Sequence, residues 1–242
     1  MIKNLLFPNK YNILVWANTL FLLVLLLSGY ASAITIVLAY FMETIIIGLF
    51  HILKLWIVVK KGKPGDPTKN DGMSGMGVIP FFIVHYGMFV AIQSIFVFSF
   101  FAHDFPEIKE AFHLIDNYTF ALQLDGMHAI IASLVVTNLG YFYTNFLATE
   151  KYKEYTPAQL FFKPYVRIFI QQFAVILAGF FFIILSQGIA AAILLLIIRL
   201  PVDLIMVGIH KDSKPFEAYV KKHSTTYNQY LETKKKYQEF SE

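Results

Sequence analysis

The chain contains no cysteine among its 242 residues. Disulfide bonds, thiolate metal ligands, iron–sulfur clusters and cysteine nucleophiles are therefore excluded. Charge is also scarce, because 15% of the residues are Asp, Glu, Lys or Arg, against about 25% in ordinary soluble domains. Phosphate-loop, dinucleotide-fingerprint, HExxH and EF-hand motifs are missing too, so the sequence carries no short motif for those chemistries.

Apolar residues make up 57% of the chain, and they come in blocks close to the length that crosses a bilayer. A soluble domain of this size has too little interior for so many apolar helices, which makes lipid the predicted solvent. We predict an all-α integral membrane bundle (residues 1–210) followed by a polar cytoplasmic tail (residues 211–242) that suits a surface helix. Six spans are expected: Asn12–Gly29, Ser32–Val59, Val78–Phe101, Tyr118–Leu147, Pro164–Leu185 and Gly188–His210.

The loop charges predict an orientation. Lysines gather in the loops 60–77 and 149–163 and in the tail, whereas the loop 102–117 is mainly acidic. Since cytoplasmic loops favour Lys and Arg, both termini are expected in the cytoplasm of a multi-pass protein of the inner (plasma) membrane. The net charge of +4 is explained by these lysines, so no nucleic-acid partner is expected. The start of the chain imitates a cleavable signal peptide, but a second apolar segment follows at once, and we expect a retained first span.

Several spans contain ionisable or amide side chains in their apolar runs. Each charge inserted there costs about 2.5–3.5 kcal/mol and needs a partner or a function. Where one span has several of these residues, they share a helix face, which predicts that they face protein rather than lipid. The first span has no ionisable residue in its body and is expected to be peripheral. The set comprises Glu43, His51 and Lys54 in the second span, His85 in the third, Arg167 and Gln171 in the fifth, and Arg199, Asp203 and His210 in the sixth.

Two interpretations of this set remain open. Neutral imidazole and carboxylate are ligands of zinc and iron, so His51, His85, His210 and Asp203 are candidate ligands of a cytoplasm-facing metal, with Glu43 as a general base. The alternative is structural: the histidines bond to neighbouring side chains or backbone carbonyls, and Glu43 forms a buried ion pair with Arg199. Arg199 and Asp203 are also one helical turn apart, and Lys54 could extend to the lipid headgroups.

Four stretches of the chain resemble one known family: Tyr40–Leu55, Ile79–Phe100, Lys163–Gly179 and Arg199–Lys211. The most specific part is the string Pro-Phe-Phe-x-x-His-Tyr-Gly at Pro80–Gly87. These residues resemble the polytopic membrane proteins catalogued as domain of unknown function 6498. The resemblance implies pattern positions at Glu43, Gly48, Lys54, His85, Tyr86, Gly87, Arg167, Asp203 and His210, with a basic residue at 199. The resemblance implies that relatives often carry histidine in place of Gln93 and Gln172 and asparagine in place of His51, so the ligand set would vary between members.

Three functions are consistent with this pattern. The first is a membrane-embedded, metal-dependent hydrolase that acts on a lipid, with zinc or iron as the cofactor. The second is a small proton-coupled transporter, in which carboxylates and histidines relay protons while Arg167 or Arg199 receives a small ion. The third is a non-catalytic scaffold whose charges only pair with one another. In that case Lys54, Arg167, Gln171 and Arg199 are structural partners rather than substrate ligands.

Overall fold

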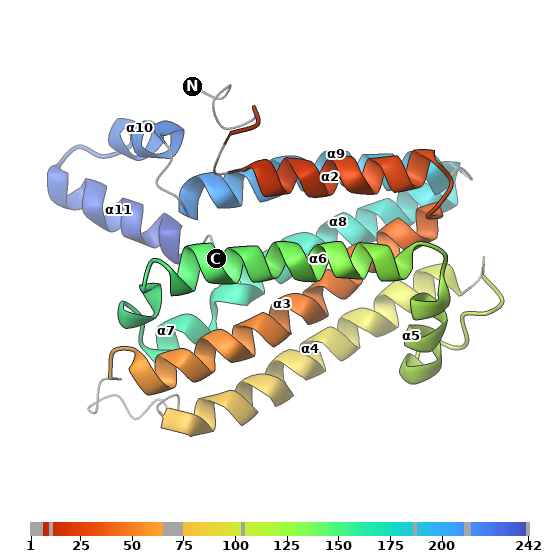
Figure 1. The fold of residues 1–242 in the computed structure, drawn as a ribbon, viewed down its shortest axis with the longest axis horizontal. Helices are drawn as coiled ribbons and strands as arrows, with labels where there is room; N and C mark the ends of the chain where they lie inside the picture. Colours follow the sequence, from red (N-terminus) through yellow and green to blue (C-terminus); the bar gives the residue numbers. More distant parts are fainter. Residues whose placement is uncertain are drawn as a thin grey trace.

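The computed structural model describes residues 7–9, 12–64, 75–102, 105–185, 188–210 and 214–240, and every regular element within these ranges is helical. The all-α prediction is therefore confirmed for this part of the chain. The long helices run side by side in one bundle (Figure 1): α2 (Ile13–Leu27), α3 (Ala33–Lys61), α4 (Val78–Phe101), α6 (Met127–Tyr141), α8 (Lys163–Leu185) and α9 (Gly188–His210). The short elements are η1 (Gly75–Gly77), α5 (Leu114–Gln123), η2 (Phe142–Leu147), η3 (Lys151–Lys153), α7 (Pro157–Phe161), α10 (Lys214–Lys222) and α11 (Tyr227–Phe240).

Helix α3 is the centre of the bundle and packs against α4, α6, α8 and α9. Ser32 caps its start by accepting a hydrogen bond from the Thr35 backbone N–H at 3.3 Å. Between Ile34 and Thr44 every side chain is buried, so this part of the helix is surrounded on all faces. A helix that is apolar all round is stable only when protein or lipid covers every face. Polar groups in this buried part of α3 consequently meet other helices rather than solvent.

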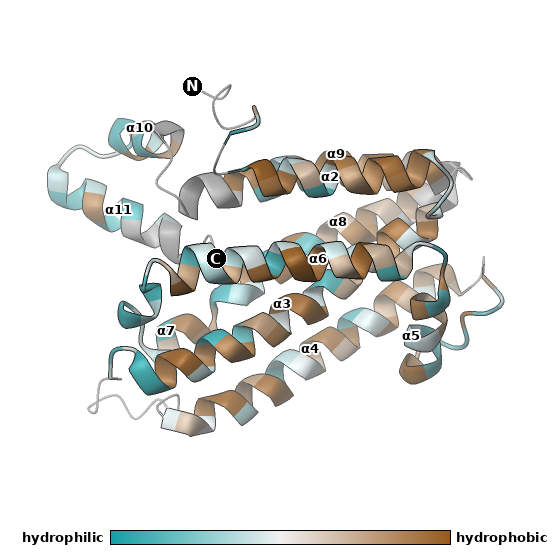
Figure 2. Cartoon of the chain, in the orientation of Figure 1, coloured by the Kyte–Doolittle hydropathy of each residue, from teal (hydrophilic) through white to brown (hydrophobic). Residues whose placement is uncertain are grey.

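Four described segments are long and apolar enough to cross a membrane: Ala33–Lys61, Gly75–Phe101, Met127–Leu147 and Pro157–Phe181. Helix α2 is apolar, but its 15 residues are fewer than the roughly 20 that cross a bilayer. Helix α9 has 23 residues. Apolar residues dominate α3 and α4, whereas hydrophilic residues concentrate in the described parts of α10 and α11 (Figure 2). The structure therefore indicates a multi-pass membrane protein, and the number six stays a prediction.

The predicted span Tyr118–Leu147 is wrong. The helix is interrupted at Leu124–Gly126: α5 ends at Gln123, and α6 begins at Met127. Gly126 has φ +77°, a left-handed conformation that glycine adopts without strain. A Cβ at this position would lie 2.8 Å from the Ala31 Cβ, so the turn also needs a small residue. Asp125 and His128, two ionisable residues within the range of that expected span, are exposed beside the turn.

The two ends of the bundle carry opposite charge. Lys60, Lys61 and Lys63 at the end of α3 lie beside η3, since the Lys63 backbone N–H donates to the Tyr155 carbonyl at 3.0 Å. At the other end, α5 packs against α4, and the acidic residues Glu107, Glu110 and Asp116 are exposed around it. We call these the lysine end and the acidic end. This separation agrees with the charge pattern from which the orientation was predicted.

The described part of the C-terminal tail forms two helices, α10 and α11, that pack on each other and on the end of α9. The Tyr237 ring lies 6.2 Å from the Phe216 ring and 5.9 Å from the Tyr219 ring, and Lys234 Nζ lies 3.4 Å from Glu217 Oε1. Phe216, Tyr219 and Tyr237 therefore pack together within a helical hairpin, whereas Tyr227 is exposed and stacks on Tyr230 of the same helix. The surface position of the tail stays a prediction.

Candidate functional site

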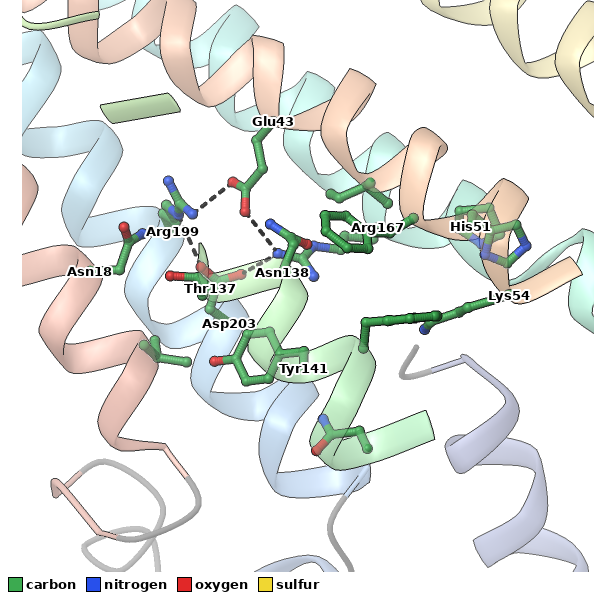
Figure 3. A pocket seen from close by; sticks show the side chains of 16 residues that line it. Asn18, Glu43, His51, Lys54, Thr137, Asn138, Tyr141, Arg167, Arg199 and Asp203 are labelled. Carbon is green, nitrogen blue, oxygen red and sulfur yellow. Dashed lines mark hydrogen bonds and ion pairs between the residues drawn. The ribbon is translucent and has the colours of Figure 1, made fainter. Parts of the chain in front are cut away.

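Four charged side chains from three helices meet inside the bundle, and we call them the charged cluster: Glu43 of α3, Arg167 of α8, and Arg199 and Asp203 of α9. Glu43 Oε2 lies 2.7 Å from Arg199 Nη2, and Glu43 Oε1 lies 3.2 Å from Arg167 Nη2. Glu43 is 1% exposed and Arg199 is 3% exposed. One carboxylate thus bridges two guanidinium groups at a position that is almost closed to solvent (Figure 3).

Asp203 completes the charged cluster from the side of α9. Its Oδ2 accepts a hydrogen bond from Arg199 Nε at 3.0 Å, and its Oδ1 lies 3.8 Å from Arg167 Nη2. Pro201 lies between Arg199 and Asp203 on the same helix. A proline inside a helix removes a backbone hydrogen bond and is a common cause of a kink. The two α9 members of the cluster therefore flank a position where the helix lacks a backbone hydrogen-bond donor.

Neutral polar groups extend the charged cluster. Gln171 donates from Nε2 to Glu43 Oε2 at 3.4 Å, and the Arg199 guanidinium lies 4.5 Å from the centre of the Tyr40 ring. Glu43 thereby has three donors, and Arg199 has two carboxylates and an aromatic face. Removing one partner of a buried ion pair costs about 3–5 kcal/mol, because the remaining charge is left uncompensated. The arrangement explains how two full charges of each sign persist in an apolar bundle.

A pocket of about 100 Å³ adjoins the charged cluster and is enclosed by α2, α3, α6, η2, α8 and α9. Glu43 and Lys54 both line it, and 11 residues of α3 separate them, which corresponds to about 16 Å along the helix. The pocket is therefore elongated along α3, with the charged cluster at one end and Lys54 toward the lysine end (Figure 3). Its charged lining consists of three cations and two anions: Lys54, Arg167, Arg199, Glu43 and Asp203.

The other residues that line the pocket include both polar and apolar side chains. His51 is 5% exposed, and its Nε2 lies 2.9 Å from the Leu160 carbonyl oxygen, an arrangement in which the imidazole N–H donates. Lys54 Nζ lies 5.4 Å from the centre of the Phe146 ring, close enough for a cation–π interaction. His51 and Lys54 therefore line the same pocket as the charged cluster without belonging to it.

His85 lies elsewhere, in what we call the histidine–aromatic region, formed by α4, α7 and the start of α8. Its Nδ1 lies 2.6 Å from the Tyr165 hydroxyl, and its ring lies 5.9 Å from the Phe161 ring. The neighbouring Tyr86 donates its hydroxyl proton to the Thr44 carbonyl at 2.6 Å. The other rings of the region are Phe81, Phe82, Phe89 and Phe169.

The structure does not assemble the predicted metal ligands within its described part, where no group of three or more His, Asp or Glu is placed to hold a metal ion. Asp203 contacts two arginines, His51 contacts a backbone carbonyl, and His85 contacts Tyr165. The fourth predicted ligand, the His210 side chain, lies outside the described residues. Glu43, Lys54, Arg167, Arg199 and Asp203 do meet around one pocket, and Gln171 contacts Glu43 behind it.

Some pocket residues were missed by the sequence analysis. Helix α2, expected to be peripheral, contributes Asn18, whose Oδ1 accepts a hydrogen bond from Ser133 at 3.0 Å. Helix α6 contributes Asn138 and Tyr141, and the Tyr141 hydroxyl is buried without a hydrogen-bond partner. Asn18 and Asn138 could have been found from the sequence, because each is an amide side chain within an apolar run. The π-helical geometry of η2, which places Asn145 in the pocket, had no comparable signal.

The fold and this site define a class, that of multi-pass helical membrane proteins with an ion-paired polar pocket inside the bundle. Residues 1–222 match the family of unknown function DUF6498, and the chain belongs to that family. No curated protein and no solved structure matches the chain. The argument for a function consequently depends on the geometry of the site.

Proposed function

We propose that this protein is a six-span carrier that moves a small anion across the membrane together with protons. In this proposal Arg167 and Arg199 receive the anion, and Glu43 and Asp203 take up the protons. Lys54 attracts the anion into the pocket from the lysine end. Both termini and the lysine end face the cytoplasm, as the positive-inside rule predicts.

The observation that carries the proposal is the shared use of two arginines by two carboxylates at the inner end of a pocket. In the charged cluster as the structure shows it, each guanidinium is already paired with two carboxylates. An incoming anion therefore has to replace a carboxylate. Replacement without neutralising that carboxylate would place a third anion beside two arginines, and like charges at this distance repel strongly in a low dielectric. Proton uptake by Glu43 or Asp203 removes that repulsion, which couples anion binding to protonation.

Two backbone features beside the pocket favour a conformational change of the helices that line it, as a carrier requires. η2 is a π-helical turn, a geometry found frequently at functional sites, and it lines the pocket through Phe142 and Asn145. Pro201 lies inside α9 between two members of the charged cluster and removes a backbone hydrogen bond there. Intramembrane charges that pair and face a cavity commonly mark ion or proton pathways. The hydrolase alternative needs His85 as a metal ligand beside Asp203 and His51, but His85 contacts Tyr165 and does not line this pocket. The scaffold alternative gives the pocket no role.

Proteoliposomes containing a pH-sensitive dye test the proposal. With an inward proton gradient and a panel of external anions (phosphate, a monocarboxylate, a dicarboxylate), we expect at least one anion to accelerate internal acidification. Glu43→Gln should abolish the anion-dependent part, because the proton acceptor is lost. Glu150→Gln is the matched control, since Glu150 is an exposed carboxylate paired with Lys153 on the surface. If no anion accelerates acidification beyond that of empty liposomes, the carrier proposal is wrong and the scaffold alternative gains.

Orientation is tested separately, and the absence of cysteine makes this direct. Lys63→Cys places a lone thiol at the lysine end and Glu110→Cys places one at the acidic end. In intact cells a membrane-impermeant maleimide should label the second and spare the first. The opposite result would invert the topology without affecting the carrier argument.

A further inference from the structure

A second pocket lies on the outer surface of the bundle at the lysine end, apart from the charged cluster. It has a volume of about 310 Å³ and is lined by Trp56, Ile57, Lys60 and Lys61 of α3, Leu147 of η2 and Tyr152 of η3. Lys60 and Lys61 are exposed, and no acidic residue is among the described residues that line the pocket. Its lining therefore combines positive charge with aromatic and aliphatic surface.

An apolar track leads to this pocket along α3. Leu49, Leu53 and Trp56 are 59%, 48% and 44% exposed, although the first half of the same helix is fully surrounded. At 100° per residue these three side chains and Lys60 fall within about 60° on one helix face. The track is thus an open apolar stripe about 10 Å long with a lysine at its end.

The lysine at the end of the track is oriented by its neighbour. Lys60 Nζ lies 4.0 Å from the centre of the Trp56 ring, within cation–π distance. Tryptophan and tyrosine favour the depth of the lipid headgroups, where an apolar ring and a polar edge are both satisfied. The apolar part of α3 ends at Val59, directly before Lys60 and Lys61. Aromatic rings, lysines and the end of the apolar helix consequently coincide at one level.

We propose that this pocket binds the phosphate of an anionic phospholipid, whose acyl chain lies along Leu49, Leu53 and Trp56. Charge complementarity comes from Lys60 and Lys61, and basic pockets between helices on the cytoplasmic side are suited to anionic headgroups. A free phosphate would use the two lysines but leave the apolar track empty. The proposal requires the membrane-spanning arrangement and the lysine end at the headgroups, but it does not require anion transport.

The two tryptophans of the chain allow a direct test. Trp16→Phe leaves Trp56 as the only tryptophan, so its fluorescence reports lipids at the pocket. This variant of the full chain is reconstituted in vesicles that contain either a brominated phosphatidylglycerol or a brominated phosphatidylcholine. Each lysine near a headgroup contributes about 5-fold in affinity. We therefore expect the anionic lipid to associate at Trp56 on the order of 25-fold more tightly than the zwitterionic lipid.

Matched variants separate charge from folding. In the Trp16→Phe background, Lys60→Gln with Lys61→Gln should bring the two association constants together, whereas arginine at both positions should retain the preference. Lys109→Gln, at the acidic end, should change nothing. Equal constants for the two lipids in the parent variant would overturn the proposal. It would also be overturned if inorganic phosphate, added at constant ionic strength, removed the preference, because the site would then be one for a soluble anion.

Absence of quenching by both lipids has a different meaning. It would show that Trp56 does not contact lipid, and the placement of α3 in the membrane would be wrong. That outcome overturns this proposal together with the topology. If no anion accelerates acidification in the liposome assay, by contrast, the carrier proposal is wrong, but the expected preference for the anionic lipid at Trp56 is unaffected.

Discussion

The charged cluster and the histidine–aromatic region are both polar inclusions in an apolar bundle, yet they are held together differently. In the charged cluster each group contacts several others, and the partners come from α3, α8 and α9. In the histidine–aromatic region His85 is half-buried, has one hydroxyl partner and contacts the rings of Phe81, Phe161 and Tyr165. A full charge in a low dielectric needs compensation from several sides, whereas a single hydrogen bond between a ring nitrogen and a hydroxyl is a smaller contribution.

The largest effect is expected from breaking the charged cluster. Arg199→Gln removes a partner from both Glu43 and Asp203, so the free energy of unfolding should fall by about 3–5 kcal/mol. Unfolding by denaturing detergent in mixed micelles measures this. Adding Glu43→Gln to Arg199→Gln should recover part of the loss, since the uncompensated carboxylate is then absent. A single variant as stable as the parent would show that the cluster does not compensate its charges.

A smaller effect is expected where the two regions meet. The ring of Tyr86 lies against Gly48 of α3, and a Cβ at Gly48 would collide with that ring. Gly48→Ala should therefore lower the free energy of unfolding by about 1–3 kcal/mol through overpacking. Gly87→Ala in the adjacent α4 is the matched control, because its Cβ would meet nothing within 4 Å. Equal behaviour of the two variants would contradict close packing of α3 on α4.

The histidine–aromatic region should tolerate a polar deletion better than the charged cluster. Tyr165→Phe removes the hydroxyl that pairs with His85 Nδ1, and one neutral hydrogen bond contributes about 0.5–1.5 kcal/mol. The same detergent titration measures the change, with Tyr143→Phe on the exposed surface as the control. A loss as large as that of Arg199→Gln would remove the distinction between the two regions.

The smallest effect is expected at the acidic end, where an ion pair is fully exposed. The hydrogen bond from Lys109 Nζ to Asp116 Oδ2 at 2.8 Å holds the pKa of the Asp116 carboxyl below its usual value. A carboxyl with a depressed pKa stabilises the fold above its unfolded-state pKa, and the contribution is lost as the pH falls through the folded-state pKa. Asp116→Asn should flatten that small acid dependence in thermal unfolding. An unchanged acid dependence would show that the pair is not formed in solution.

The sequence predicted the helices well where apolar runs ended in clear signals. The expected spans at Val78–Phe101 and Gly188–His210 match α4 and α9, and the ends of α3 differ by two residues or fewer. It failed between Tyr118 and Leu147, because apolar residues on both sides of Asp125-Gly126 outweighed a local turn signal. Hydropathy averaged over a window does not register one glycine with positive φ.

The site was predicted in part, for a physical reason. Helical periodicity identifies the residues that share a face, and it correctly paired Arg199 with Asp203 on α9. It does not determine which faces of distant helices meet. The contact of Arg167 with both carboxylates follows from the packing of α8 against α3 and α9, and His85 on α4 contacts a different part of α8 at Tyr165. The catalytic, metal-binding and transport roles assigned to these residues remain predictions.

The order of the cluster along the chain has a consequence for synthesis. Glu43 enters the membrane with α3, but its partner Arg167 is translated 124 residues later, and Arg199 later still. At about 5–20 residues per second the first arginine arrives about 6–25 s after Glu43. During that interval the carboxylate has no guanidinium beside it, so α3 has to remain close to water or to the insertion machinery. Assembly of this bundle is therefore completed only when its C-terminal third has been made.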